Sequence, residues 1–273
     1  MAFDPPPPQD DGLLVPDVGP WSADKHYFLG RYLDAFTTAM RKKRWNGLHY
    51  IDLFAGAGIE NVQGKGLDWG SPLLAAQLPH QFSRLHLCEL MRTKFEALRE
   101  RLPRFVQSET PQLICGDANV EVVSVVEAIP PRSLSVAFLD PYGLDLHFDT
   151  LGQLASRRVD LIIFFPDHLD ALRNCRYVYE ETPDSKLDRV LGTTTWRAKL
   201  DTEPPDRWAS LFSELYVEQI RTLGYDHFEY ERVTMPNGRF LYRLIFCSRD
   251  ATGTQIWRNV ARDKANGQRG FDY

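Results

Sequence analysis

The sequence has few cysteines and no long apolar run, and each absence excludes a class of protein. The four cysteines are far apart, at Cys88, Cys115, Cys175 and Cys247. No two have the close spacing of a zinc knuckle or a redox pair, so we expect reduced thiols and no metal site. The longest apolar runs, such as residues 161–166, are far shorter than the roughly 20 residues that cross a bilayer. No basic segment followed by an apolar one opens the chain, so we expect no secretory signal, no membrane association and a cytoplasmic location.

A surplus of positive charge is also missing. The 32 lysines and arginines are outnumbered by 37 acidic residues, which gives a formal net charge of −5. A protein that coats nucleic acid usually carries a basic surface, so this sign weighs against a duplex-coating protein. Net charge averages over all faces, however, and a local basic cleft is compatible with it. The basic residues near the end of the chain form either a solvated face or a phosphate contact; they are Arg258, Arg262, Lys264 and Arg269.

What is present is typical of one globular α/β domain, with 43% hydrophobic and 12% aromatic residues. Residues 1–20, which include four successive prolines, predict a disordered or extended tail without packing of its own. The apolar spacing of residues 21–44 predicts a helix with Ser22 as its N-cap. We expect the main domain to span residues 21–265 and a second tail to cover residues 266–273.

Five nearly continuous apolar segments then alternate with helix-like ones. The predicted strands cover residues 48–54, 85–89, 111–115, 134–139 and 159–165. Such alternation predicts a Rossmann-like, doubly wound and mainly parallel sheet. Residues 167–224 predict a helical insertion after the fifth strand. Two later strand-like segments flank Pro236-Asn237-Gly238, a turn sequence that predicts an antiparallel C-terminal hairpin closing the sheet.

The first strand leads into a turn with two glycines, Asp52-Leu-Phe-Ala-Gly-Ala-Gly58. Glycine allows a cofactor to approach the backbone closely and permits positive φ. Asp52 can order the turn amides or meet an amino group of the cofactor. We therefore predict that the turn binds a cofactor through Asp52, Phe54, Ala55, Gly56 and Gly58. A glycine pair is weak evidence when taken alone, because any tight turn after a strand can contain one.

Acidic residues end the second and third predicted strands. Glu89 is placed to accept hydrogen bonds from both ribose hydroxyls of a nucleoside, or else it only caps the helix that begins near Met91. It follows Asp52 by 37 residues (89 − 52), because residues 59–69 form an inserted loop. Asp117 and Ala118 are expected beside an adenine ring, although Asp117 can equally cap the next helix.

The fourth strand ends in Asp140-Pro141-Tyr142-Gly143, where an acceptor would meet the cofactor. Asp140 can accept a hydrogen bond from an amine or act as a general base. Tyr142 can stack on a planar base, and Pro141 stiffens the loop. The alternative is an ordinary turn. Because the carboxyl ends of parallel strands share one edge, these strand ends predict a single nucleoside-shaped site.

Several other residues are candidates for the same site. Lys25 and His26 begin the helix before the first strand, where His26 either touches the cofactor or lies in a solvated turn. Asp167 and His168 follow the fifth strand, and His168 could move a proton if it is not merely exposed. Arg173 and Arg176 could hold a phosphate or carboxylate of the acceptor.

Taken together, these segments resemble the three-Cys-motif partner proteins, a bacterial family with class I methyltransferase architecture. The similarity covers residues 21–265, and the matching residues are Lys25-His26, Tyr32, 50–58, 70–73, 138–143, 160–166 and 242–246. The resemblance implies a class I methyltransferase fold that binds S-adenosylmethionine (SAM). It also implies a partner protein that looks like a radical-SAM protein.

Two further likenesses concern the methyl acceptor. Residues 52–58 are similar to the first motif of DNA cytosine-C5 methyltransferases, but no cysteine here follows a proline, so their nucleophile is missing. Residues 139–143 look like the Asp-Pro-Phe-Gly signature of tRNA guanine-N2 methyltransferases and like a shortened Asp-Pro-Pro-Tyr of amino-methylating DNA enzymes. These two likenesses of residues 139–143 indicate that the methyl acceptor is an exocyclic amine of a nucleobase or nucleotide. A non-catalytic SAM-binding partner protein and a small-molecule methyltransferase are the alternatives, and the oligomeric state stays open.

Overall fold

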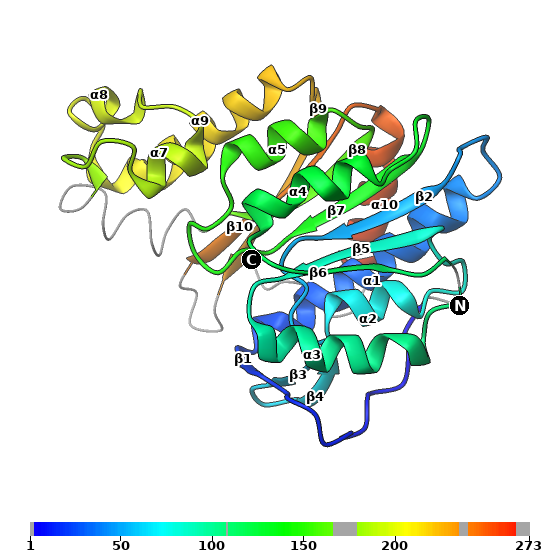
Figure 1. Ribbon diagram of the computed structural model, residues 1–273. Helices are drawn as coiled ribbons and strands as arrows, with labels where there is room; N and C mark the ends of the chain where they lie inside the picture. Colours follow the sequence, from blue (N-terminus) through cyan, green and yellow to red (C-terminus); the bar gives the residue numbers. More distant parts are fainter. Residues whose placement is uncertain (1–2, 108, 166–178, 235–239, 266–273) are drawn as a thin grey trace.

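The computed structural model describes residues 3–107, 109–165, 179–234 and 240–265 (Figure 1). Seven strands form one sheet in the order β6-β5-β2-β7-β8-β10-β9. Their bounds are β2 (Leu48–Asp52), β5 (Arg84–Glu89), β6 (Gln112–Cys115), β7 (Leu134–Leu139), β8 (Val159–Phe165), β9 (His227–Thr234) and β10 (Phe240–Ser248). The first five are mutually parallel, as the apolar runs predicted. The order reverses between β2 and β7, which places a topological switch point at the carboxyl ends of these two strands.

The sheet is closed by an antiparallel hairpin, which confirms the prediction for the end of the chain. β10 pairs antiparallel with β8, for example through Ile245 and Ile163, and with β9 on its other side. The predicted turn Pro236-Asn237-Gly238 lies outside the described residues, as does the predicted tail 266–273. A parallel sheet of five strands closed in this way has the strand order of the Rossmann-like class I methyltransferase fold.

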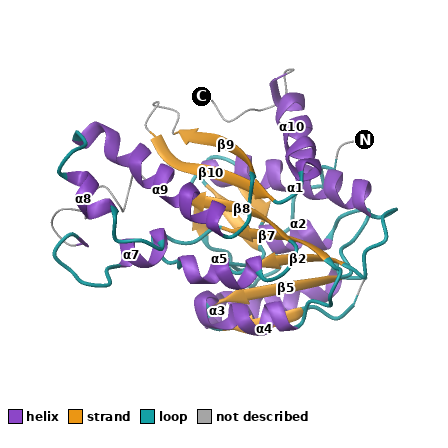
Figure 2. Ribbon diagram, turned by 90° about the horizontal axis from the view of Figure 1, so that it is seen from above, coloured by secondary structure: helices purple, strands orange, loops and turns teal. Residues whose placement is uncertain are grey.

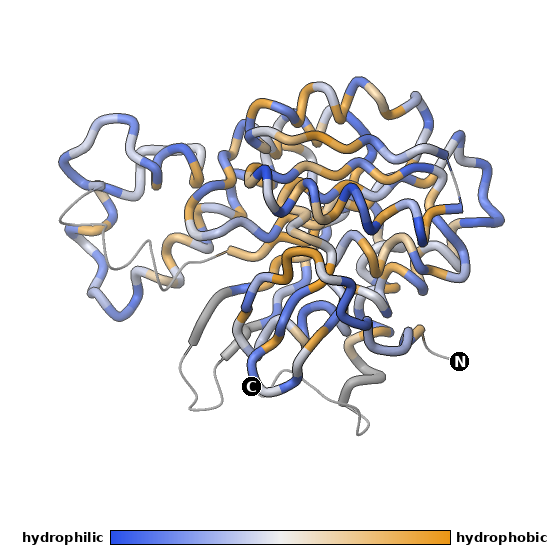
Figure 3. The backbone as a smooth tube through the Cα atoms, turned by 60° about the horizontal axis from the view of Figure 1, so that its bottom comes forward, coloured by the Kyte–Doolittle hydropathy of each residue, from blue (hydrophilic) through white to orange (hydrophobic). Residues whose placement is uncertain are grey.

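Helices cover both faces of the sheet, so the strands are buried on each side (Figures 1 and 2). One layer contains α1 (Trp21–Met40), α2 (Ser71–Ala76), α3 (Arg92–Arg101) with the short η1 (Leu102–Arg104), and α10 (Ala251–Ala265). The other contains α4 (Ala118–Glu127) and α5 (Phe148–Ala155). In the first layer the rings of Tyr32, Phe246 and Trp257 pack with centroids 4.7–5.5 Å apart, which joins α1 and α10 over β10. Figure 3 shows the apolar strands running between more hydrophilic outer segments.

Helix α1 begins at Trp21, two residues before the start that an N-cap at Ser22 implies. Pro20 precedes the first helical residue, and Ser22 lies inside the helix, buried, with its N–H bonded to the Gly19 carbonyl oxygen at 3.1 Å. The prediction of Ser22 as N-cap is therefore wrong, because proline already has the φ of a first helical turn. The helix ends at Met40, ahead of four exposed basic residues.

The described part of the segment between β8 and β9, from residue 179 onward, is mainly helical, as predicted. It contains α7 (Lys186–Leu191), α8 (Trp196–Leu200), η3 (Pro205–Arg207) and α9 (Trp208–Thr222), which extend beside the sheet in Figure 1. A capping box between Ser185 and Asp188 starts α7, and Asp188 also accepts hydrogen bonds from Trp196 and Arg197. These bonds tie α8 to α7.

Residues 59–69 differ from the predicted glycine-rich loop. They form a hairpin of β3 (Ile59–Val62) and β4 (Gly66–Trp69), joined through Gly64 and Gly66 at positive φ. β1 (Asp17–Val18) adds to β3 and makes a second, small sheet. The positive φ values explain the glycines, which the sequence interpretation had taken as a sign of irregular structure.

The N-terminal segment is extended, but it packs against the domain, which the sequence did not predict. The Trp69 indole N–H donates to the Pro6 carbonyl oxygen at 2.7 Å. Asp11 accepts two hydrogen bonds from the buried Arg101 of α3. Arg101 also reaches the Leu14 carbonyl oxygen, so one side chain anchors much of the segment. Within the described ranges, no helix is both long enough and apolar enough to pass through a bilayer.

Candidate functional site

The glycine turn follows β2 at the switch point. Gly56 and Gly58 have φ values of 66° and 85°, which other residues rarely adopt. A Cβ on Gly58 would lie 2.9 Å from Leu73, so packing also requires glycine there. A Cβ on Gly56 would meet only the Glu60 carboxylate, at 3.9 Å. The side of Gly56 is therefore open, and it is where a ligand can approach the backbone.

Asp52 lies beneath this turn and is fully buried. Its carboxylate accepts hydrogen bonds from the Ser71 hydroxyl (2.6 Å), the Tyr50 hydroxyl (3.1 Å) and the Phe54 N–H (3.2 Å). Burial raises the pKa of Asp52 to about 7. Of the two predicted roles, these contacts support the ordering of the turn amides, since the side chain already bonds three protein groups.

Glu89 brings the end of β5 to the same turn. Its two carboxylate oxygens accept hydrogen bonds from the Gly56 N–H at 2.8 Å and the Met91 N–H at 2.7 Å. The residue is only 7% exposed. Glu89 therefore bonds the residue that precedes α3, as the capping alternative predicted, and it lies beside Gly56, while its ribose-binding role stays a prediction.

Asp117 caps α4 by accepting a hydrogen bond from the Asn119 N–H at 2.8 Å, and Ala118 is buried behind it. Asn119 was not predicted. Its side-chain oxygen accepts from the His147 N–H (2.9 Å) and the Thr150 hydroxyl (2.7 Å), and its side-chain nitrogen donates to the Asp145 carbonyl oxygen (2.9 Å). Asn119 thus ties the loop after β6 to the segment that follows Asp140-Pro141-Tyr142-Gly143.

Asp140, at the end of β7, forms an ion pair with Lys25 of α1. Lys25 has 8% of its side chain exposed and also lies over the Phe164 ring, 5.3 Å from its centroid. Burial lowers the pKa of Lys25, but the negative charges of Asp140 and Glu60 outweigh burial, and the pKa is raised. The lysine is therefore a buried cation whose charge depends on its carboxylate neighbours.

His26 and Glu60 lie beside this pair. The His26 Nδ1 and a Glu60 carboxylate oxygen are 3.7 Å apart, and neither atom has a hydrogen-bond partner among the described residues. Burial, together with the Lys25 charge, holds the pKa of His26 well below its usual value, so the imidazole is neutral. Burial raises the pKa of Glu60. His26 is 3% exposed, which rules out the solvated first turn considered above.

Tyr142 and a small apolar hollow adjoin Asp140. Tyr142 is 95% exposed, and Gly143 after it has a φ of 75°. The hollow lies at the carboxyl ends of β7 and β8, and its walls include Phe165 and Tyr216, whose rings stack with centroids 4.5 Å apart. The other lining residues are Pro141, Gly143, Leu146, Ile163, Phe164 and Val190. Such a hollow suits an apolar or aromatic ring more than a charged group.

The structure therefore joins residues from four elements at one edge: Gly56 with Glu89, and Lys25 with Asp140. Glu60 was missed because residues 59–69 were interpreted as a loop; the alternation of that segment is the signal that could have revealed a strand. The other candidates, Asp167, His168, Arg173 and Arg176, lie outside the described residues.

The remaining predictions concern the basic end of the chain, the thiols and metals. Arg258 pairs with Glu229 at 2.6 Å, while Arg269 and the side chains of Arg262 and Lys264 lie outside the described part. The described cysteines, Cys88, Cys115 and Cys247, are free thiols. No group of three or more metal-ligating side chains occurs in the described ranges.

Comparison with known proteins supports the fold. No protein-family model and no curated protein matches the chain. Among solved structures, protein LPL1258 from Legionella pneumophila has a TM-score of 0.56 at 14% identity, over 93% of this chain and 94% of that one. Trm1 from Pyrococcus horikoshii, solved with SAM, has a TM-score of 0.41 at 11% identity, over 84% of this chain and 57% of that one. The O-methyltransferase TomG from Streptomyces achromogenes, also solved with SAM, has a TM-score of 0.44 at 12% identity, over 80% and 79%.

Only the first of these scores exceeds 0.5, and at 14% identity it shows a shared fold and nothing about activity. The chain has the strand order of a class I SAM-dependent methyltransferase. The likeness to the three-Cys-motif partner proteins stays a resemblance of sequence motifs.

Proposed function

We propose that this protein is a SAM-dependent methyltransferase that acts on an exocyclic amine of a nucleobase or nucleotide. One observation carries the proposal. The Asp140 carboxylate stands at the switch-point edge, paired with Lys25 of α1, where the Gly56 amide meets the Glu89 carboxylate. A nucleotide-type site and a carboxylate suited to an amine therefore share one edge of the sheet.

The residues at this edge fit SAM. Gly56 has an open side, and Glu89 beside it can accept hydrogen bonds from ribose hydroxyls. Asp117 and Ala118 would frame the adenine ring, and Phe54 and Ala55 would complete the turn. SAM carries a sulfonium and an ammonium ion, and the acidic groups Asp52, Glu60 and Asp140 face a single buried lysine. When bound, SAM would supply an electrophilic methyl group.

Asp140 would act on the acceptor mainly by orientation. A carboxylate that accepts a hydrogen bond from an amine N–H aims the nitrogen lone pair, and such positioning is worth several kcal/mol of the barrier. Lys25, paired with the Asp140 carboxylate, would hold it in place for this contact. Methyl transfer would break the S–CH₃ bond as the N–CH₃ bond forms, with S-adenosylhomocysteine as the leaving group, and the proton of the resulting cationic nitrogen would pass to Asp140 or to solvent.

Tyr142 and the apolar hollow would hold the ring that bears the amine. The exposed Tyr142 can close over a planar ring, and Pro141 limits the movement of the loop. Pro141 and Gly143, on either side of Tyr142, border the apolar hollow. A base held between these groups would present its edge toward Asp140.

The decisive experiment separates binding from chemistry. We expect Asp140→Ala to retain SAM affinity within a few fold in calorimetry, and to lose methyl transfer from labelled SAM to total RNA, DNA or a small-molecule extract by about 10²-fold or more. Asp145→Ala, at a half-exposed carboxylate later in the same loop, is the control and should retain both properties. Loss of SAM binding with normal turnover per bound cofactor would contradict the role given to Asp140.

One observation favours a second candidate. Lys25 already occupies the Asp140 carboxylate, so a site that binds SAM without transferring its methyl group is consistent with the same geometry. In that case the protein would present SAM or a nucleoside to a partner, such as a radical-SAM-like protein. Tight SAM binding with no methylated product in any of the three extracts would support this candidate. A methylated product in the small-molecule extract alone would instead support a small-molecule methyltransferase.

A further inference from the structure

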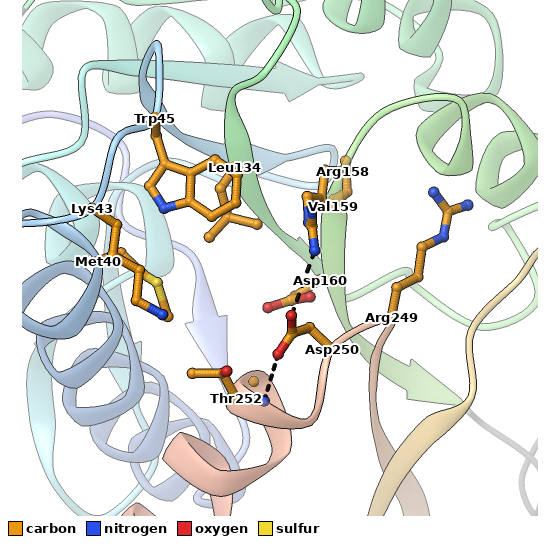
Figure 4. Close-up of a pocket in the computed structure, with 11 residues that line it drawn as sticks. Met40, Lys43, Trp45, Leu134, Arg158, Val159, Asp160, Arg249, Asp250 and Thr252 are labelled. Atoms are coloured by element: carbon orange, nitrogen blue, oxygen red, sulfur yellow. Dashed lines mark hydrogen bonds and ion pairs between the residues drawn. The ribbon is translucent and has the colours of Figure 1, made fainter.

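A second hollow lies at the opposite edge of the sheet, where β7 and β8 begin. It is formed by the segment after α1, the start of β7 and β8, and the junction of β10 with α10 (Figure 4). In Figure 4, Trp45, Arg158 and Asp250 surround it from three sides. The lining residues are Met40, Lys43, Trp45, Leu134, Arg158, Val159, Asp160, Arg249, Asp250, Thr252 and Gly253. None of these belongs to the site described above.

Six cations stand in the loops before β2, β7 and β8, and we call them the basic edge: Arg41, Lys42, Lys43, Arg44, Arg132 and Arg158; of these, Lys43 and Arg158 line the hollow itself. All six are exposed. The Asn46 N–H donates to the Arg132 carbonyl oxygen at 3.1 Å, which brings the loop before β7 beside the loop before β2. The Arg158 guanidinium lies over the Trp45 ring, 5.4 Å from its centroid. The basic edge therefore combines residues from three separate loops in a protein whose net charge is −5.

Two acids line the hollow, and they offset the charge of this edge only in part. Asp250 is 3.5 Å from the Arg158 guanidinium and also accepts the Thr252 N–H at 2.8 Å. Asp160 is buried, and burial raises the pKa of Asp160 to about 7, which favours its neutral form. The side chains of Lys42 and Arg44 make no hydrogen bond or ion pair with the part of the chain that the structure describes, whereas the Lys43 charge acts on Asp250.

Trp45 adds an aromatic group to the basic edge. The ring is half-buried, and its Nε1 has no hydrogen-bond partner among the described residues. An aromatic ring within a basic surface is the arrangement by which proteins hold single-stranded nucleic acid, since bases stack on the ring while cations follow the phosphates. A duplex offers no free base for such contact, whereas loops and bulges of RNA do.

We propose that the basic edge binds single-stranded RNA, with phosphates on the cations and one unstacked base at Trp45. The inference deepens the proposed function. It rests on that function only in taking the methyl acceptor to be part of a polymer. The hollow and the methyltransferase site lie at opposite ends of the strands. A bound RNA would therefore pass from one edge to the other, which a folded RNA can do but a free nucleotide cannot.

The test measures binding of a fluorescein-labelled 20-nucleotide oligouridylate by anisotropy, at salt concentrations from about 50 to 200 mM. We expect Lys42→Glu/Arg44→Glu to weaken binding at least tenfold and to reduce the slope of log affinity against log salt by about two. Lys199→Glu/Arg207→Glu changes the charge equally on the insertion helices and should leave binding within twofold. Trp45→Leu should weaken binding about tenfold without changing the slope.

Several outcomes would overturn the proposal. The first is an equal RNA affinity of the wild type and the Lys42→Glu/Arg44→Glu variant. The second is tighter binding of a duplex than of the single strand. The third is displacement of the labelled RNA by polyglutamate at a lower concentration than by unlabelled RNA. Polyglutamate displacement would indicate an acidic protein partner. Lys42→Gln/Arg44→Gln serves as a milder replacement if the first variant unfolds. Asp140→Ala should bind RNA normally, so loss of methyl transfer and loss of RNA binding are distinguishable failures.

Discussion

Asp11 accepts two hydrogen bonds from Arg101, at 2.7 and 2.8 Å, across 90 residues of sequence. The same guanidinium donates to the carbonyl oxygen of Ala57, between the two glycines of the cofactor turn, at 2.7 Å. Arg101 is fully buried. The N-terminal segment therefore helps to hold the glycine turn in place, and removing the segment would affect the site through the Arg101 side chain.

Asp11→Ala leaves the buried Arg101 without its counter-charge. Breaking a buried ion pair by removing one partner costs about 3 kcal/mol or more, so we expect a comparable fall in the free energy of unfolding measured with urea. SAM affinity should also fall, because Ala57 loses a fixed donor. Asp10→Ala, at an exposed acid that bonds only the local Gly12 N–H among the described contacts, is the control. Equal stabilities of the two variants would show that Arg101 finds other partners.

Lys25→Met removes the positive charge nearest Asp140. Because SAM is itself a sulfonium cation, we expect the variant to bind SAM about tenfold more tightly, while affinity for the uncharged thioether S-adenosylhomocysteine changes little. Methyl transfer should decrease, since Asp140 loses the contact that holds it. Lys25→Arg retains the charge and should bind both compounds as the wild type does. Parallel calorimetric titrations give the ratio of affinities, and an unchanged ratio in Lys25→Met would contradict the assignment of Lys25 to the cofactor site.

Glu89→Gln keeps the size of the side chain and removes its charge. Hydrogen bonds to a charged group contribute about 1.5–3 kcal/mol, so affinity for both SAM and S-adenosylhomocysteine should fall roughly 10- to 100-fold. The thermal midpoint should also fall, because the one amide oxygen of Gln cannot accept from both the Gly56 and the Met91 N–H groups. Glu100→Gln, at an exposed acid of α3, is the matched control. If Glu89→Gln affected SAM but not the thioether, the carboxylate would bind the sulfonium end and not the ribose.

Asp52 makes the stability of the fold depend on pH. Burial raises the pKa of Asp52 from 3.8 to about 7, so its contribution is complete below pH 4 and is lost as the pH rises through 7. Asp52→Asn should therefore become more stable relative to the wild type as the pH rises from 4 to 7. His49 and His86, whose pKa burial lowers to about 4, act in the opposite direction, but they are common to both proteins.

Urea unfolding of both proteins at several pH values tests this, with Asp149→Asn as an exposed control that should follow the wild type. A constant difference between Asp52→Asn and the wild type would show that Asp52 ionises as easily in the folded as in the unfolded chain. Asp160→Asn should resemble Asp52→Asn, because burial raises the pKa of Asp160 to about 7 as well.

The local sequence was sufficient to identify most of the fold. The predicted apolar segments correspond to β2, β5, β6, β7 and β8. A strand that is buried on both faces is apolar along nearly its whole length, so the local sequence is enough to recognise it. It was also sufficient to place Gly56, Glu89 and Asp140 at one edge, because parallel strands all end on the same side. The alternation of residues 59–69 extends over only four residues in each strand, so it is a weak signal beside the glycines that favoured a loop.

What the sequence by itself determined is therefore the order of strands and helices and the chemistry at the strand ends, both of which depend on short-range pattern. Only the tertiary structure decided which distant side chains meet: Lys25 with Asp140, across 115 residues, and Arg101 with Asp11. It also buried His26 beside Glu60. These contacts arise from the packing of α1, α3 and the N-terminal segment onto the sheet. Side chains at large sequence separation carry no local signal of one another, because the energy that joins them exists only once the elements are packed.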